Sequence, residues 1–155
     1  MLEAELLRPL RKTAAADAPS SSTLLGDWYA HVLFVQRRPL VLAVSARTLL
    51  PVLVPARDPA TLGPRLCVEL GLVLAALGIP HALIREEQLQ MTEVVFDRTV
   101  SRQILGSMND FDRLLDLAPG ESLTSAALQL ARAPCRPIGM KSPDRATARL
   151  FAERG

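Results

Sequence analysis

Two apolar runs flank a short polar stretch at residues 28–46, WYAHVLFVQRRPLVLAVSA, and this feature limits the possible folds more than any other. Both runs are rich in Val, Leu or aromatic residues, which strands favour, and the QRRP between them is typical of a turn. The pattern predicts a β-hairpin with strands at 28–35 and 40–46. Both faces of the first strand are largely apolar, so we expect it to lie inside a sheet.

The segments after the hairpin indicate a third strand and two main helices. The TLLPVLV run at 48–54 has strand character, but Pro51 cannot donate a backbone hydrogen bond, which places the strand at an edge or a bulge. Apolar residues recur every three or four positions over 61–77, before a Gly and a Pro. This spacing predicts a helix that is buried nearly all round. A second helix is predicted over 101–117.

Shorter elements complete the predicted fold. They are a short or broken helix within 2–12, one or two helical turns at 81–90, a short strand ending at Phe96 and a final helix at 144–153. We predict an α+β fold in which a small antiparallel sheet of three or four strands is packed by two main helices. One domain is expected over 25–155, after an N-terminal segment and flexible connector at 1–24.

Composition excludes several classes of protein. The formal net charge is only +2, so a nucleic-acid-binding surface would have to be local. The longest uncharged stretch, 70–84, is shorter than the ~18 apolar residues of a membrane-spanning helix, and we expect no membrane association. Cys67 and Cys135 have neither a CxxC nor a zinc spacing and follow no secretory signal. They indicate reduced thiols in a cytoplasmic protein.

The sequence carries no motif that identifies an enzyme. Serine-nucleophile, Walker and dinucleotide-binding patterns are absent, and catalytic residues stay unknown. The His and Cys residues have no metal-ligand spacing, so no metal and no cofactor are expected. An alternative is a metal-dependent nuclease or hydrolase that gathers carboxylates around magnesium. Those carboxylates would be Glu93, Asp97, Asp110 and Asp112.

The helix predicted over 101–117 contains an unusual peptide, GSMND. Four of its five residues are poor helix formers, yet the apolar period continues through it. One interpretation is that Gly106 and Ser107 let a neighbouring element approach closely. The other is that Ser107, Asn109 and Asp110 offer hydrogen-bonding groups to a ligand or partner.

Charged residues lie both beside GSMND and at the hairpin. Arg102 and Arg113 lie beside GSMND, and one of Asn109 and Asp110 is expected to brace Arg113. At the hairpin, Arg37 and Arg38 would join Arg47 and Arg57 in a basic end of the sheet that contacts phosphate or an acidic partner. The alternative is that these arginines only keep the hairpin soluble.

Three stretches together resemble an uncharacterised bacterial family, a domain of unknown function. They are GDWYAHVLFVQRRPLVLAVSARTLL, SRQILGSMNDF and a tail containing Pro-Cys. The family has a Trp at a strand start, a basic hairpin, a T-L after the second strand and a GSMND-like helix, and the likeness spans about 25–145. The resemblance implies an association with plasmid-type reading frames. It also implies that one signature contains Trp28, Arg38, Gly106, Ser107, Asn109 and Asp110.

We therefore predict a non-enzymatic bacterial interaction module with a protein partner. The predicted binding residues are Arg102, Ser107, Asn109, Asp110 and Arg113. A nucleic-acid-binding protein that uses the basic hairpin, with contacts from Arg37 and Arg38, is the first alternative. The metal-dependent nuclease or hydrolase is the second.

Overall fold

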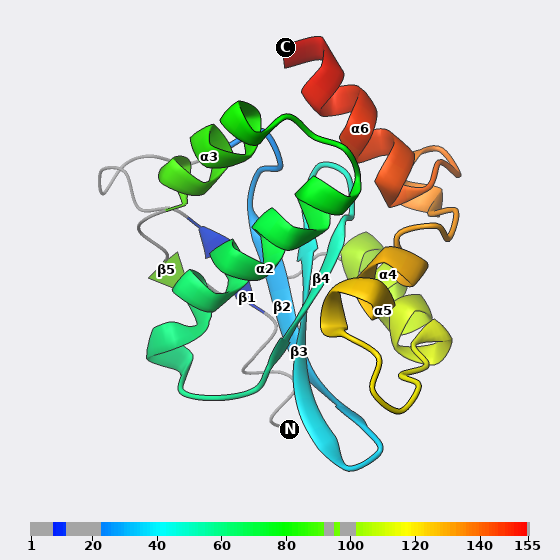
Figure 1. Ribbon diagram of the computed structural model, residues 1–155. Helices are drawn as coiled ribbons and strands as arrows, with labels where there is room; N and C mark the ends of the chain where they lie inside the picture. Colours follow the sequence, from blue (N-terminus) through cyan, green and yellow to red (C-terminus); the bar gives the residue numbers. More distant parts are fainter. Residues whose placement is uncertain (1–7, 12–22, 92–94, 97–101, 155) are drawn as a thin grey trace.

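The structure is a computed structural model that describes residues 8–11, 23–91, 95–96 and 102–154 (Figure 1). Five strands form one antiparallel sheet in the order β4-β3-β2-β1-β5. The strands are β1 (Arg8–Arg11), β2 (Trp28–Val35), β3 (Arg38–Ser45), β4 (Pro51–Pro55) and β5 (Val95–Phe96). The α-helices are α2 (Leu62–Ala76), α3 (His81–Gln90), α4 (Arg102–Leu114), α5 (Leu123–Leu130) and α6 (Pro143–Arg154), and 3-10 helices cover Pro59–Thr61 and Arg136–Ile138. The predicted α+β class is confirmed.

The predicted hairpin is present. β2 and β3 pair along their whole length, from Trp28 opposite Ser45 to Val35 opposite Arg38. At the turn, Gln36 and Arg37 have φ angles of 53° and 66°, as a two-residue turn that matches the strand twist requires. β2 lies between β1 and β3, inside the sheet as expected.

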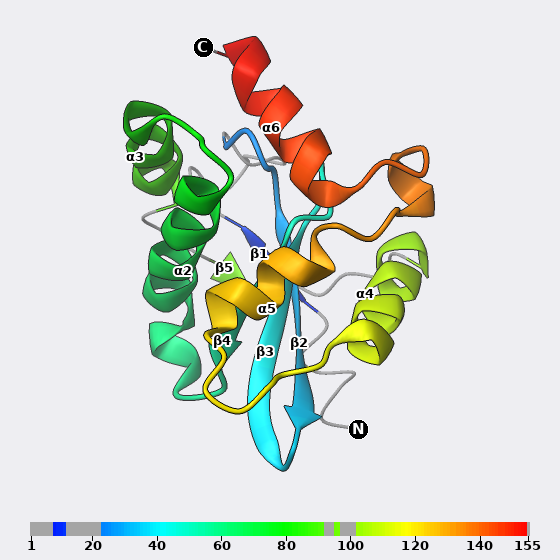
Figure 2. The same ribbon diagram turned by 45° about the vertical axis from the view of Figure 1, so that its right-hand side comes forward.

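Helices cover both faces of the sheet. Every residue of β3 from Leu40 to Ser45 is buried, although successive side chains point to opposite faces. Figure 2 shows α2 and α3 on one side of the strands and α4 on the other. α2 and α5 both pack against β4. The largest fully buried side chains include Trp28, Phe111 and Phe151.

The helix predicted within residues 2–12 is wrong, because β1 occupies the described part of that segment. Arg8 lies opposite Ala30 of β2, and β1 pairs on its other side with β5. Backbone groups along the edge of β2 form hydrogen bonds with β1. These bonds outweigh the weak helix preference of residues 8–11. β1 and β5 extend the sheet predicted from 28–54. The predicted connector lies mostly at 12–22, outside the described residues.

The other predicted elements are found, with two corrections. β4 lies at an edge of the sheet, as Pro51 indicates. α2 is not buried all round, since Val68 and Leu72 are 63% and 51% exposed. The sequence predicts one or two helical turns at 81–90, but α3 has 10 residues. Within the described residues, no helix combines the length and the apolar character needed to cross a membrane.

Candidate functional site

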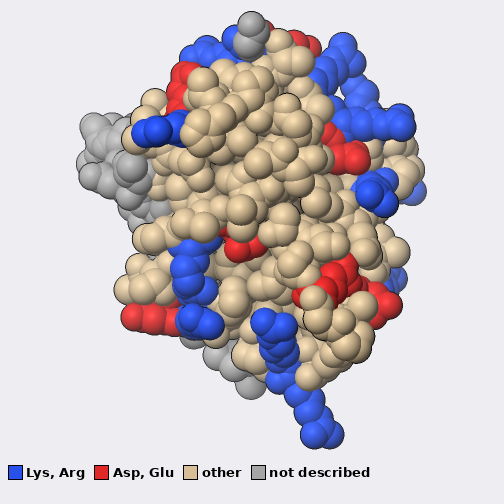
Figure 3. Space-filling view, viewed as in Figure 1, with Lys and Arg blue, Asp and Glu red and all other residues tan. Residues whose placement is uncertain are grey.

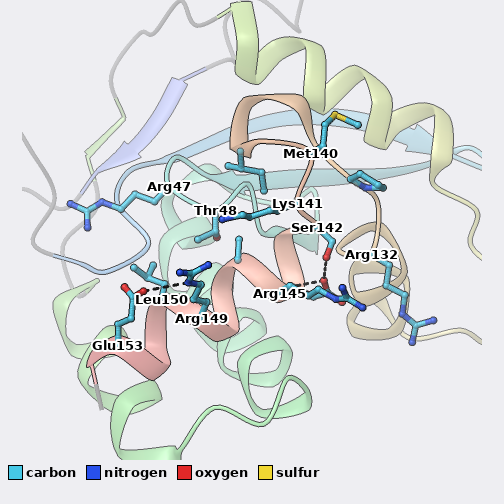
Figure 4. Close-up of a pocket in the computed structure, with 14 residues that line it drawn as sticks. Arg47, Thr48, Arg132, Met140, Lys141, Ser142, Arg145, Arg149, Leu150 and Glu153 are labelled. Atoms are coloured by element: carbon cyan, nitrogen blue, oxygen red, sulfur yellow. Dashed lines mark hydrogen bonds and ion pairs between the residues drawn. The ribbon is translucent and has the colours of Figure 1, made fainter.

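A groove of about 1170 Å³ lies beside α6, at the end of the sheet where β3 turns into β4 (Figure 4). Three segments that are far apart in the sequence line it. They are the turn after β3, the loop that includes residues 132–142, and α6. The groove is therefore a product of the tertiary fold, and no local sequence pattern predicts it as a whole.

Positive side chains dominate the lining of this groove. The cations are Arg47, Arg132, Lys141, Arg145 and Arg149, and the acids are Asp144 and Glu153. Figure 3 shows Lys and Arg gathered at the upper right of the molecule, over α6 and the loop before it. Because the whole chain carries a formal charge of only +2, this excess of cations is local.

Neither acid neutralises the groove. Arg149 Nε lies 3.5 Å from Glu153 Oε1, and both side chains are largely exposed, so water screens this ion pair. The Asp144 carboxylate accepts hydrogen bonds from the Arg145 N–H at 2.7 Å and from the Ser142 hydroxyl. Asp144 thus satisfies backbone and side-chain donors at the start of α6, where a carboxylate is favoured. The charge of Arg47 also acts on the buried Glu87, while Arg132, Lys141 and Arg145 form no ion pair within the described residues.

A buried hydroxyl network, the floor network, lies behind Thr48, the one of its three residues that lines the groove. Thr147 of α6 donates to Thr48 Oγ1 at 2.8 Å, and the hydroxyls of Thr48 and Ser45 lie 3.0 Å apart. Ser45 Oγ also accepts from the backbone N–H of Leu50 at 3.1 Å. The network fixes α6 to the turn after β3. It gives a structural role to Thr48, the Thr of the T-L feature in the family resemblance.

A hydrogen-bonded loop forms one wall of the groove. The Cys135 N–H donates to the carbonyl of Lys141 at 2.9 Å, and the Met140 N–H donates to the carbonyl of Cys135 at 2.9 Å. The loop holds Met140 at a φ of 61°, with its side chain 59% exposed. Met140 and Lys141 both line the groove.

The structure separates the four arginines that the sequence placed at one basic end. Arg37 and Arg38 are exposed at the tip of the hairpin, and Arg57 follows β4 toward the same end, where the Ala56 N–H donates to Pro39. Arg47 follows β3 and lies at the opposite end. The eight residues of β3 span about 26 Å at ~3.3 Å per residue. The prediction that Arg47 belongs to the hairpin end is wrong, since antiparallel strands place successive connections at alternate ends.

The GSMND residues are also divided. Ser107 is buried, at 6% exposure, whereas Asn109 and Asp110 are exposed. Asp110 forms an ion pair with Arg113, which confirms the predicted brace. Arg102 begins α4, and its side chain lies outside the described residues. Of the predicted binding residues whose side chains are described, Asn109, Asp110 and Arg113 are therefore open to solvent and Ser107 is not.

Gly106 does not admit a close neighbour. A Cβ atom there would meet no atom within 4 Å, so the interpretation of Gly106 as a point of close approach is wrong. The close approach occurs at Gly71 of α2, where a Cβ would lie 2.4 Å from Gln88 Nε2 of α3. The choice of glycine at 106 has no packing explanation.

α4 lies next to the groove wall. It packs against the 3-10 helix Arg136–Ile138, which belongs to the same loop as Met140. Burial raises the pKa of Cys135 to about 11, and the nearby Asp110 carboxylate adds to the rise. A thiol with so high a pKa stays protonated near neutral pH and is a poor nucleophile. The helix with the GSMND peptide thus supports the loop that carries Met140.

Two titratable groups outside the groove lining, the buried Glu87 and the half-buried Cys67, have shifted pKa values. Burial raises the pKa of Glu87, against the lowering effects of hydrogen bonds from the N–H groups of Leu24 and Leu25 and of the positive charge of Arg47. Burial, followed by the charge of Glu87, also raises the pKa of Cys67. Both cysteines are free thiols.

The sequence predicts no metal site but leaves a magnesium-dependent nuclease or hydrolase as an alternative. In the part of the chain that the structure describes, no three His, Cys, Asp or Glu side chains gather in a way that could hold a metal ion. Asp110 and Asp112 both lie on α4, while Glu93 and Asp97 lie outside the described residues.

Most of the groove residues belong to no pattern that the sequence shows, although one pattern indicates part of the groove. Arg145 and Arg149 are four residues apart on α6 and so share one face of the helix, with Lys141 shortly before them. This spacing indicates a basic helix face. Arg132 and Arg47 join that face only through the fold.

The fold and the groove define a small α+β domain with a basic groove at one end of its sheet. The chain belongs to the family described as a domain of unknown function (DUF6933), whose model matches residues 2–146. No curated protein and no solved structure matches the chain. Four of the five groove cations lie within the matched range, and Arg149 lies beyond it.

Proposed function

We propose that this domain is a non-enzymatic binding module that holds a nucleic acid in the groove beside α6. The observation that supports the proposal is the gathering of five cationic side chains against two acids in one groove. Four of the five are arginines, whose planar guanidinium groups form paired hydrogen bonds with phosphate oxygens. The proposal moves the predicted nucleic-acid surface from the hairpin to the opposite end of the sheet.

The chemistry of the lining favours binding over catalysis. Arginine stays protonated at all physiological pH values, so it cannot exchange protons as a general acid or base does. The Asp144 carboxylate is engaged at the start of α6. The bacterial origin, the cytoplasmic location and the plasmid-type association expected from the sequence are part of this proposal, since such a setting offers nucleic acid as a partner.

Fluorescence anisotropy with a labelled oligonucleotide tests the proposal. We expect the full chain to bind at low salt and to lose affinity steeply as salt rises, because each phosphate contact releases counterions. Arg145→Glu should weaken binding about tenfold or more and reduce the salt dependence. Arg85→Glu, which reverses an exposed charge on α3, is the matched control and should change affinity less than about twofold. Equal effects of the two substitutions, or no binding at low salt, would overturn the proposal.

A second candidate is the predicted protein-interaction module, with α4 as its contact surface. Leu114 is 58% exposed at the end of the helix that presents Asn109 and Asp110. Leu114 also lines a hollow of about 300 Å³ together with Asp116 and Gln129. An exposed apolar side chain beside polar groups and a hollow is typical of a protein contact.

The double substitution Asn109→Ala with Asp110→Ala tests this second candidate. A partner that the wild-type chain captures from a lysate should be lost, while the melting temperature stays nearly unchanged, because exposed changes usually alter stability by about 0.5 kcal/mol or less. A normal set of captured proteins with a much lower melting temperature would assign the peptide to stability alone.

A further inference from the structure

Met140 is held in a costly conformation with its apolar side chain in solvent. Its φ of 61° lies in the left-handed region, which a residue with a Cβ atom seldom adopts. The N–H of Met140 bonds to the carbonyl of Cys135, and the bridge between Cys135 and Lys141 closes the loop. Strained residues that the surrounding structure enforces gather at binding sites. The loop therefore holds the exposed Met140 at the rim of the groove in a fixed position.

The groove combines apolar and cationic groups. Ile138, Met140 and Leu150 line it together with Lys141 and Arg149. In Figure 4, Met140 lies on the loop at one side of the groove with its side chain directed toward α4, and Arg145 and Arg149 come from α6 on the other side. A ligand in this space would meet positive charge and exposed hydrocarbon or thioether atoms at the same time.

A single nucleic-acid strand offers phosphates to the cations and base faces to the apolar groups, whereas a duplex offers chiefly phosphates. A duplex stacks its base faces inside and presents phosphates, sugars and base edges. A single strand also exposes the base faces, which pack against flat or adaptable side chains. The polarisable thioether of methionine makes favourable contacts with aromatic rings. Met140 thus suits an exposed base face.

The size of the groove favours several nucleotides over one. Its volume of about 1170 Å³ is above the range of roughly 300–1,000 Å³ that small-molecule pockets occupy. Its cations also come from three separate segments, the turn after β3, the loop at 132–142 and α6. A short stretch of strand can contact cations from more than one of them.

We infer that the ligand of the groove is a single-stranded nucleic acid, with its phosphates on Lys141, Arg145 and Arg149 and a base face on Met140. This inference rests on the proposed function and names its ligand class. It also assigns Met140 as the residue that distinguishes single strands from duplexes.

Anisotropy with two probes of equal length tests the inference. The probes are a labelled single-stranded oligonucleotide and the blunt duplex of the same sequence, each titrated with the full-length chain. We expect the single strand to bind at least about fivefold more tightly. Met140→Ala should weaken single-strand binding about threefold to tenfold, as loss of a sulfur–aromatic contact implies, and should leave duplex binding unchanged.

Two further variants serve as controls for Met140→Ala. Alanine retains a Cβ atom and hence the same backbone strain, so Met140→Ala tests the side chain and a melting curve verifies its fold. Met140→Leu keeps an apolar side chain of similar size but has no sulfur, so it should restore only part of the single-strand affinity. Leu89→Ala removes a side chain that is 64% exposed on α3 and should change neither affinity.

The failure of the inference differs from the failure of the proposed function. If both probes bind with similar affinity and Met140→Ala changes neither, the single-strand inference is overturned while nucleic-acid binding stands. If neither probe binds at low salt, the proposed function itself is overturned. If Leu89→Ala weakens the single strand as much as Met140→Ala does, the role of Met140 is overturned.

Discussion

Thr147 of α6 donates a hydrogen bond of 2.8 Å to Thr48 in the turn after β3, across 99 positions of the sequence. Thr147 is fully buried and Thr48 is 4% exposed. The bond joins the last helix of the domain to the sheet directly beneath the basic groove. The shape of the groove therefore depends on a contact between two segments that are distant in the sequence.

Thr147→Val should lower the free energy of unfolding by about 1–2 kcal/mol. Valine matches threonine in shape but removes the hydroxyl, so Thr48 keeps only Ser45 as a side-chain hydrogen-bond partner. Chemical denaturation measures the change. Thr124→Val is the control, because it removes a half-buried bond of 3.0 Å to Glu69 and should cost less than about 1 kcal/mol. A smaller loss at Thr147 than at Thr124 would contradict the structural role of the floor network.

Glu87 joins α3 to the segment just before β2, and Glu87→Ala should lower the free energy of unfolding by about 2–4 kcal/mol. Its two carboxylate oxygens accept hydrogen bonds from the N–H groups of Leu24 at 2.9 Å and Leu25 at 3.0 Å. The substitution leaves two largely buried donors without this partner, and each such loss costs about 1–3 kcal/mol before relaxation. Glu86→Ala is the matched control, since it removes an exposed ion pair with Arg154 and should cost at most about 1 kcal/mol.

The raised pKa of Glu87 predicts a specific dependence of stability on pH. Burial raises the pKa of the folded carboxyl above its ordinary value of 4.5, so the folded chain takes up this proton at a higher pH than the unfolded chain. The resulting stabilisation is complete below pH 4.5 and is lost as pH rises through the folded pKa. The charge of Arg47 lowers the pKa of Glu87, and the charge of Glu86 raises it. The charge of Glu87 in turn raises the pKa of Cys67.

Glu87→Gln isolates that dependence, because glutamine does not titrate. The stability of the wild-type chain relative to this variant should increase as pH falls toward 4.5, because Glu87 takes up its proton at a higher pH in the folded chain than in the unfolded chain. Denaturation curves of both proteins at pH 5, 6 and 7 provide the measurement. A constant difference across these three values would show that burial does not shift the ionisation of Glu87.

The hairpin was predictable because its information is local. Strand periodicity and the QRRP turn fixed β2 and β3 to within about two residues of their observed bounds. β1 was not predictable, since its partner is the free edge of β2, which exists only in the folded sheet. The groove lay beyond local patterns for the same reason: its cations extend from Arg47 to Arg149 along the chain. Ser107 was predicted to contact a ligand or partner but is buried, because it lies four residues before the buried Phe111 on the same face of α4. The open space at Gly106 did not follow from its residue type.

Gly106→Ala should stabilise the domain by about 0.5–1 kcal/mol, because alanine favours a helix interior and its Cβ would meet nothing within 4 Å. For a domain of this size, the melting temperature should rise by roughly 2–4 °C. Gly71→Ala is the contrasting control. Its Cβ would lie 2.4 Å from Gln88 Nε2, whose amide bonds to the Cys67 carbonyl at 3.1 Å, so the gain in helix preference should be cancelled or reversed. Thermal melts of both variants decide the matter: a loss of stability at Gly106 would mean that this position requires glycine after all.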